Sequence, residues 1–444
     1  MNGTTSRAVA VAAAAALALA GCGSGDDPTD AAGDEQVSAA DVRAALEAGG
    51  ELTVWAWEPT LAEVVTDFQA AYPNVTVELV NAGTGDDQYT ALQNAIAAGD
   101  GLPDVAQIEY YALPQFALAG SVTDLTGYGA GDLADTFTPG PWSSVNTGGG
   151  VHGLPMDSGP MALFYNQEVF DEHGIDVPAT WDEYVDAARE LHRADPQVYI
   201  TNDVGDAGFT TSLIWQSGGQ PFQVDGTEVT IDFTDDGSAR FADTWQQLIS
   251  EDLLAPVSSW SDQWYQGLAD GTIASLATGA WMPANLISGV ADGAGKWRVA
   301  PLPQWDAGGT ASAENGGSSL AVPSAAANKA LAYGFIEYAN AGDGVQIRVD
   351  GGAFPATTAQ LQSPEFLGAE FAYFGGQQAN EIFAESAGNV VDGWSYLPFQ
   401  VYANSVFNDT VGQAYVSDTP LTDALNAWRD TCVSYGTDQG FTVS

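Results

Sequence analysis

The sequence predicts an α/β protein whose first sheet is parallel. Short apolar segments rich in β-branched residues alternate with segments whose apolar residues recur at helical spacing, and this alternation indicates βαβ units. The chain has 444 residues, which is enough for two or more domains with separate cores. Apolar residues make up 45% of the sequence, so a folded chain is favoured over a disordered one.

The N-terminal segment has the features of a cleaved targeting sequence. Arg7 precedes an uninterrupted apolar run, Ala8 to Ala20, which is too short to span a bilayer and suits a signal peptide over residues 1–21. Leu19-Ala20-Gly21-Cys22 resembles the lipobox of bacterial lipoproteins, so we expect lipid on the Cys22 thiol. The alternative is an ordinary signal peptide followed by a chance cysteine.

The lipid on Cys22 is the only membrane anchor that we expect. No later segment reaches transmembrane length, so the predicted location is the extracellular face of the cytoplasmic membrane. Residues 22–50 are predicted to be the lipidated cysteine and a flexible tether, because the segment starts with glycine, aspartate and small residues. The other cysteine, Cys432, is expected to be a small buried apolar residue without a disulfide.

Folded structure is expected from Leu52 onward. The segment Leu52 to Trp57 is apolar on both faces, which is typical of a buried parallel strand. Thr60 and Glu63 have the spacing of a capping box, so a helix should follow. Two more strands are predicted at 75–80 and 104–108, with a second helix between them.

A second region of alternating strands and helices begins after Asp157. Met161 to Asn166 has a strand-like composition, and Thr180 and Glu183 repeat the capping-box spacing ahead of an amphipathic helix. Trp297 to Leu302 predicts a further strand. The chain therefore contains at least two regions that can each build a sheet.

Charge and motifs exclude several classes of function. The chain carries 58 acidic and 10 basic residues, a net charge of −48, which disfavours binding to nucleic acid and to anionic lipid surfaces. It contains no nucleophile elbow, zinc motif, phosphate loop, dinucleotide loop or calcium loop. We therefore expect no cofactor, no metal and no catalytic residues. Paired carboxylates leave a secreted glycoside hydrolase as the enzymatic alternative.

Several motifs occur together in an order and spacing that carry a family resemblance. They are Gly153 to Pro160 followed by Leu163 to Asn166, then Pro178 to Glu183, then Trp297 to Pro303 with Asn315 to Ser319, and finally Phe374 to Gln377. Together with the lipobox, they resemble the solute-binding lipoproteins of carbohydrate ABC transporters, the broad family that includes maltose-binding protein. The resemblance covers the chain from about Leu52 to its end.

The resemblance implies a two-lobed, periplasmic-binding-protein-like α/β fold with a hinge and a ligand cleft between the lobes. Lobe one would hold residues 51–157 and 304–350, and lobe two would hold residues 158–303 and 351–444. The implied function is to capture a neutral sugar, a mono- or oligosaccharide, and to deliver it to an ABC-type membrane permease. We expect a monomer.

The candidate ligand-binding residues follow from the chemistry of sugars. Sugars present hydroxyl groups and weakly apolar C–H faces, which carboxylates, amides and aromatic rings recognise. Side chains of these kinds, and glycines that expose backbone N–H groups, occur at predicted strand ends, helix starts and lobe crossings. The candidates are Trp57, Glu58, Asp87, Gln88, Glu109, Tyr110, Asp157, Trp215, Trp281, Asn315, Gly316, Gly317, Phe354 and Trp394.

Structural roles remain open for some of these candidates. Trp57 and at least one tryptophan of lobe two are also compatible with the core, Asp87 with a helix cap, and Phe354 with hinge packing. Asn315, Gly316 and Gly317 are together also compatible with a plain turn. A cationic ligand such as a quaternary amine also suits aromatic and acidic side chains. Anionic ligands are disfavoured because the arginines are scattered along the sequence.

Overall fold

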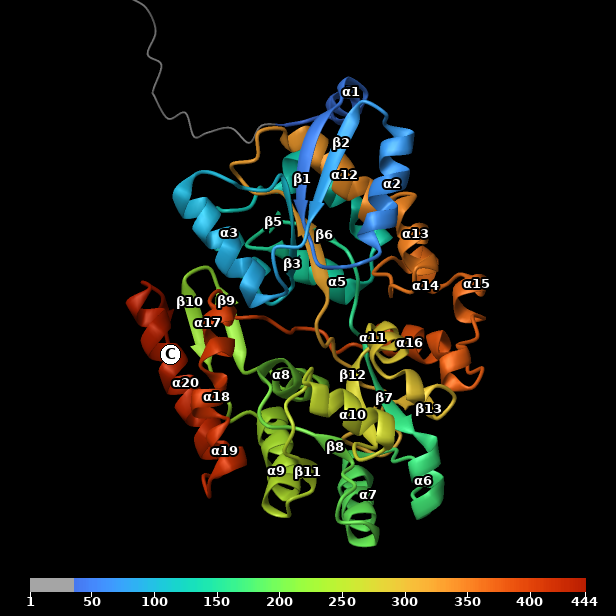
Figure 1. Cartoon of the computed structure of the whole chain (residues 1–444). Helices are drawn as coiled ribbons and strands as arrows, with labels where there is room; N and C mark the ends of the chain where they lie inside the picture. The colour runs from blue at the N-terminus through green and yellow to red at the C-terminus, as the bar shows by residue number, and fades with distance from the viewer. Residues whose placement is uncertain (1–35) are drawn as a thin grey trace, which may run out of the picture. The chain divides into compact units, whose positions relative to one another are not determined.

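The computed structural model describes residues 36–444. The predicted signal peptide, Cys22 and the first part of the predicted tether lie outside the described residues. Two sheets with separate hydrophobic clusters divide residues 36–444 into two lobes, with β1, β2 and β3 in one lobe and β7, β12 and β13 in the other (Figure 1). The two-lobed α/β fold is thus confirmed. None of the helices in residues 36–444 is long and apolar enough to cross a membrane.

The sheet of lobe one has the strand order β2-β1-β3-β14-β6. Its strands are β1 (Gly50–Trp55), β2 (Val75–Val80), β3 (Val105–Glu109), β6 (Leu154–Pro155) and β14 (Ser318–Ala321). The first three are parallel, as predicted, whereas β14 runs antiparallel to both β3 and β6. A strand from late in the chain therefore completes the sheet of lobe one.

Amphipathic helices cover this sheet. In α2 (Leu61–Ala71) the apolar face formed by Leu61, Val64, Val65 and Phe68 is buried. Phe68 packs edge-on against Phe335 of α12, with ring centroids 5.1 Å apart. The other elements of lobe one are α3 (Asp86–Ala98), α4 (Leu113–Leu118), η1 (Leu125–Tyr128), η2 (Ala130–Thr136), α5 (Pro139–Val145), the hairpin of β4 (Asn146–Thr147) and β5 (Gly150–Val151), α12 (Lys329–Ala341) and α13 (Gly344–Asp350).

Part of the predicted tether is a helix, α1 (Ala39–Ala48). Ser38 and Asp41 form a reciprocal capping box at its start, which satisfies two backbone N–H groups. Val42 and Leu46 are buried. Leu46 packs against Gly334 of α12, and a Cβ added to Gly334 would lie 3.0 Å from the Leu46 side chain. The prediction of a flexible tether up to residue 50 is therefore wrong for this helix, which belongs to the core of lobe one.

The central sheet of lobe two is antiparallel. Strand β7 (Met161–Asn166) lies between β12 (Ser275–Gly279) and β13 (Trp297–Pro301), and both neighbours run opposite to it. The strands at 161–166 and 297–301 were predicted from composition. Their direction was not, because a run of apolar residues does not show from which end the chain enters the sheet.

Lobe two also contains smaller sheets and most of the helices. Its strands are β8 (Thr201–Asn202), β9 (Phe222–Asp225), β10 (Glu228–Ile231), β11 (Leu254–Ala255) and β15 (Thr442–Val443). Its helices are α6 (Gln167–His173), α7 (Trp181–Ala194), α8 (Ala207–Gln216), α9 (Asp236–Ser250), α10 (Asp262–Asp270), α11 (Met282–Gly289), η3 (Ala291–Gly293), α14 (Thr358–Leu361), α15 (Pro364–Leu367), η4 (Ala372–Phe374), α16 (Ala379–Gly388), α17 (Gln400–Ser405), α18 (Phe407–Thr410), α19 (Gln413–Val416) and α20 (Leu421–Asp438).

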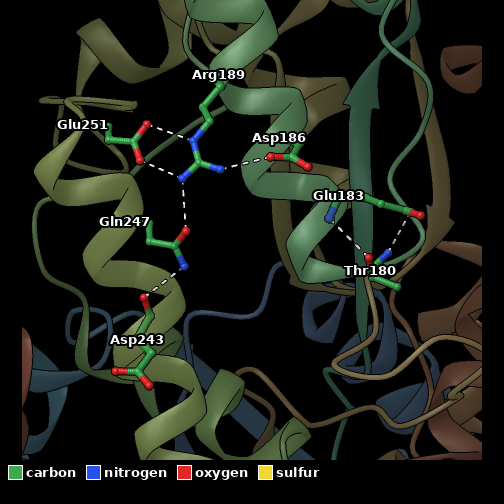
Figure 2. Close-up of polar contacts among 7 residues, drawn as sticks. All are labelled: Thr180, Glu183, Asp186, Arg189, Asp243, Gln247 and Glu251. Carbon is green, nitrogen blue, oxygen red and sulfur yellow. Dashed lines mark hydrogen bonds and ion pairs between the residues drawn. The ribbon is translucent and has the colours of Figure 1, made fainter.

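Helix α7 begins at the predicted capping box. Thr180 accepts a hydrogen bond from the N–H of Glu183, and the Glu183 carboxylate accepts one from the N–H of Thr180 (Figure 2). Further along α7, Arg189 donates to both carboxylate oxygens of Glu251 at the end of α9, at 2.8 and 2.6 Å (Figure 2). The pair is exposed, so it contributes about 0–1 kcal/mol and aligns two helices whose apolar faces supply most of the stability.

The chain crosses between the lobes three times, at residues 156–160, 302–317 and 351–357. Isolated bridges Asp157↔Pro355 and Pro160↔Glu314 hold these crossings side by side. The second crossing stays with lobe two longer than expected, because Ala313 packs in that lobe's core and Ser312 pairs with Val390. The return to lobe one begins at β14, not near residue 304.

Candidate functional site

A buried glutamate joins the first two crossings. Glu314 is 2% exposed, and its carboxylate accepts hydrogen bonds from the Ser158 hydroxyl at 2.9 Å and the Gly159 N–H at 2.5 Å. Glycine is required at 159, because a Cβ there would lie 2.2 Å from the backbone oxygen of Asn315. Burial raises the pKa of Glu314 to about 7, although the hydrogen bonds from Gly159 and Ser158 lower it. Glu314 was not among the predicted residues.

Asp157 lies where the first crossing leaves lobe one. Its Oδ1 accepts a hydrogen bond from the N–H of Ser318 at 2.6 Å, and its backbone oxygen accepts one from the Tyr110 hydroxyl at 2.6 Å. Gly317, beside Tyr110, has a φ of +99° and no room for a Cβ. The structure therefore brings together the predicted residues Tyr110, Asp157 and Gly317.

Arg348 of α13 is the cation beside this group, and sequence reasoning missed it. Its side chain is 3% exposed, its Nη1 donates to the backbone oxygen of Met156, and its Nε lies 3.7 Å from Oε2 of Glu58. Burial raises the pKa of Asp157 to about 6, and the Arg348 charge acts in the opposite direction. Arg348 thus lies beside one acidic group of lobe one, Glu58, and one of the first crossing, Asp157.

Aromatic and acidic side chains gather at the end of β3. The Tyr89 hydroxyl donates to Oε2 of Glu109 at 2.9 Å, and Tyr89 meets Trp57 and Tyr111 edge-on with ring centroids 6.3 and 6.1 Å apart. Burial raises the pKa of Glu109 to about 7, while hydrogen bonds from the two tyrosines lower it. Trp57 and Glu109 were predicted here, whereas Tyr89 and Tyr111 were not singled out.

Gln107 of β3 fixes the segment that follows β1. Its Oε1 accepts hydrogen bonds from the N–H groups of Trp57 and Glu58, at 3.0 and 3.1 Å. Gln88 is fully buried and donates to the backbone oxygen of Gln107 at 2.7 Å, so its amide holds β3, a role that differs from the predicted ligand contact. Asp87 is exposed in the first turn of α3, where a carboxylate complements the helix dipole.

Lobe two brings Trp281 to the second crossing. The Trp281 Nε1 donates to the backbone oxygen of Asn315 at 2.6 Å, and the Asn315 amide bonds to Ser212 and Thr278, each at 3.2 Å. Gly316 follows with a φ of +77°, and a Cβ there would lie 3.1 Å from the same indole nitrogen. The predicted residues Trp281, Asn315 and Gly316 therefore lie together, with the indole half-buried.

The other aromatic candidates pack against one another or the core. Trp215 and Trp394 stack with centroids 5.2 Å apart and an angle of 8°, and Trp215 is 5% exposed, so it is chiefly a core residue. Trp394 is half-buried and meets Tyr396, which packs against the hydrophobic cluster of lobe one. Phe354 is 4% exposed and packs between Phe366 and Phe383, which is the hinge-packing alternative rather than a ligand contact.

Two surface cavities of lobe two lie away from these residues. One, of about 820 Å³, is lined by residues of α6, by residues 294–296 and by Arg298 of β13. The other, of about 180 Å³, lies beside α10. None of the candidate residues lines either cavity. Within residues 36–444, no group of histidine, cysteine, aspartate or glutamate side chains is arranged to hold a metal ion.

Comparisons with known proteins place these observations in a family. Residues 55–345 match the family model described as bacterial extracellular solute-binding protein. An ABC-transporter-associated binding protein from B. animalis subsp. lactis Bl-04, solved in complex with β-1,6-galactobiose, is 46% identical. Its TM-score is 0.82, and the match covers 89% of this chain and 99% of that chain.

Two further relatives are similar over most of the chain. The lactose-binding protein of Rhizobium radiobacter is 28% identical over 403 residues, which cover 86% of this chain and 92% of that protein. The galacto-N-biose- and lacto-N-biose-binding protein of Bifidobacterium longum, solved with lacto-N-biose, is 26% identical. Its TM-score is 0.79, and the match covers 89% of this chain and 99% of that chain.

Proposed function

The chain belongs to the family of bacterial extracellular solute-binding proteins, and on this premise we propose that it captures a neutral, β-linked galactosyl oligosaccharide for an ABC-type membrane permease. The three relatives described above bind β-1,6-galactobiose, lactose and lacto-N-biose by their names. Each of these sugars carries a galactose in β-linkage. The shared galactosyl unit makes this the class of ligand with the most support.

The observation that carries the proposal is that aromatic and acidic side chains lie at the lobe crossings and at the end of β3. Trp57 and Glu109 come from lobe one, Trp281 from lobe two, and Asp157 from a crossing. Indole rings cover the C–H faces of a sugar, and carboxylates accept hydrogen bonds from its hydroxyls. Arg348 lies beside the carboxylates of Glu58 and Asp157, and the negative charge of these two groups disfavours an anionic ligand there.

Titration calorimetry on the full chain in mild detergent tests the proposal. β-1,6-galactobiose, lactose and lacto-N-biose are compared with galactose, maltose and choline. Binding of the galactosyl disaccharides without binding of choline supports the proposal. Binding of choline alone would establish the cationic alternative, and release of free galactose from a disaccharide would establish a hydrolase.

Trp281→Ala is expected to weaken disaccharide binding by about 10- to 100-fold, because a truncated aromatic anchor costs about 1.5–3 kcal/mol. Trp305→Ala is the matched control, since this indole is also half-buried in lobe two but packs on Trp181, with centroids 5.6 Å apart. Calorimetry compares the two variants with the unchanged protein. Equal affinities for Trp281→Ala and the unchanged protein would remove Trp281 from the site.

We also infer that lipid on Cys22 holds the protein at the extracellular face of the cytoplasmic membrane. The support is the sequence Leu19-Ala20-Gly21-Cys22. In cells fed labelled fatty acid, Cys22→Ser is expected to lose the label and to leave the membrane fraction. Cys432→Ser is the control, because Cys432 is 1% exposed and should not accept lipid. Label retained in Cys22→Ser contradicts the inference.

A further inference from the structure

An exposed tryptophan with a strained backbone lies next to the candidate site. Trp260 has a φ of +68°, and only one other non-glycine residue among residues 36–444, Asp252, has a positive φ. For a bulky side chain this conformation costs about 1–2 kcal/mol. The indole of Trp260 is nevertheless 49% exposed, so burial of the ring does not account for the conformation.

Hydrogen bonds on both sides fix the segment that carries Trp260. The Asn202 amide donates to the backbone oxygen of Val257 and to the Ser259 hydroxyl, both at 3.0 Å. On the other side, Ser261 caps α10 by accepting from the N–H of Trp264 at 3.2 Å, and the Trp264 indole donates to Asn202 at 2.8 Å. The surrounding structure therefore imposes the position of Trp260.

Trp260 extends the aromatic surface that begins at the second crossing. Its ring lies on Trp281 with centroids 5.7 Å apart and an angle of 32°, and Trp264 supports it from another side at 5.0 Å. Trp281 is anchored to Asn315 through its indole nitrogen. The contacts therefore run from Asn315 at the crossing to the half-buried indole of Trp281 and on to the more exposed indole of Trp260.

We propose that Trp260 forms the outer aromatic wall of the sugar site and contacts the second ring of a bound disaccharide. The inference rests on the proposed function and assigns a residue that determines ligand length. A rigidly held aromatic side chain loses little conformational entropy on binding, so it provides contact area at low cost. A sugar ring placed on this indole removes apolar surface that the free protein exposes to water.

The test compares three substitutions at position 260 in the full chain. Trp260→Ala is expected to weaken galactobiose binding by about 10-fold, as for the loss of one aromatic contact, whereas Trp260→Phe retains most of the affinity. Trp260→Gly separates side chain from strain, because glycine adopts a positive φ readily. Trp260→Gly should lose affinity for galactobiose as Trp260→Ala does, yet it should be at least as stable to heat as Trp260→Ala.

A second measurement reports contact directly. In protein that carries fluorine-labelled tryptophan, the fluorine resonance of Trp260 is the one that is missing in Trp260→Phe. This resonance is expected to shift when galactobiose is added and to stay in place when galactose is added. Unchanged galactobiose affinity in Trp260→Ala overturns the inference, and so does an equal shift with both sugars. If the unchanged protein binds no galactosyl sugar at all, the proposed function itself has failed, which is a distinct result.

Discussion

Arg348→Met is expected to lower the free energy of unfolding by about 3–5 kcal/mol, the typical loss when one partner of a buried ion pair is removed. The guanidinium lies beside Glu58 and Asp157, and its Nη1 donates to the backbone of Met156. Without it, the partly buried carboxylates of Glu58 and Asp157 lose their cation. The loss should be smaller in mild acid, where Asp157, whose pKa is about 6, takes up a proton.

Arg43→Met is the matched control, since it changes the net charge equally at an exposed position of α1. Thermal melting and chemical denaturation of Arg348→Met, Arg43→Met and the unchanged protein, at mildly acid and mildly alkaline pH, measure the change in the free energy of unfolding. A stability of Arg348→Met equal to that of the control at both pH values would show that the ion pair contributes nothing.

Glu314→Gln is expected to raise stability above neutral pH while leaving it nearly unchanged in mild acid. The pKa of Glu314 is about 7 in the folded protein and 4.5 ordinarily, so the folded state binds this proton more tightly than the unfolded state. Its contribution to the free energy of unfolding therefore falls as pH rises from 4.5 through about 7. Glutamine removes this titration and can still accept from Gly159 and donate to Ser158.

The expected gain at alkaline pH is up to about 3 kcal/mol, from about 1.4 kcal/mol for each pKa unit. Many carboxylates titrate in this protein, so the informative quantity is the difference between variant and unchanged protein at each pH. Glu370→Gln, at an exposed position, should give a difference near zero throughout. A Glu314→Gln difference that does not grow with pH contradicts a buried, proton-binding Glu314.

Local sequence signals predicted the elements of the fold well. The strand predicted from Leu52 to Trp57 overlaps β1, which begins two residues earlier and ends at Trp55, and the Thr180 capping box starts α7, because both depend on residues close in sequence. Helix α1 was missed because only two of its residues, Val42 and Leu46, are buried, and their partner α12 lies far along the chain. The directions of β12 and β13 depend on topology, which composition does not contain.

The candidate site was predictable where it follows strand ends and family-like motifs. Glu109, Asp157, Trp281 and Asn315 lie close to a crossing or a strand end for that reason. Arg348 was not predictable, because on its helix it resembles any amphipathic arginine until the fold buries it beside acidic groups. Glu314 is recognised by its hydrogen bonds to the first crossing, and Trp260 by its positive φ angle. A pattern of residues in the sequence shows neither feature.

The placement of β14 between β3 and β6 has a consequence for how the protein is made. A nascent chain cannot close the sheet of lobe one until residue 321 has been synthesised. Strand β6 joins β1, β2 and β3 only through β14, which is encoded after most of lobe two. Neither lobe is therefore one continuous segment of the chain, and the sheet of lobe one is completed only after residue 321 has been added.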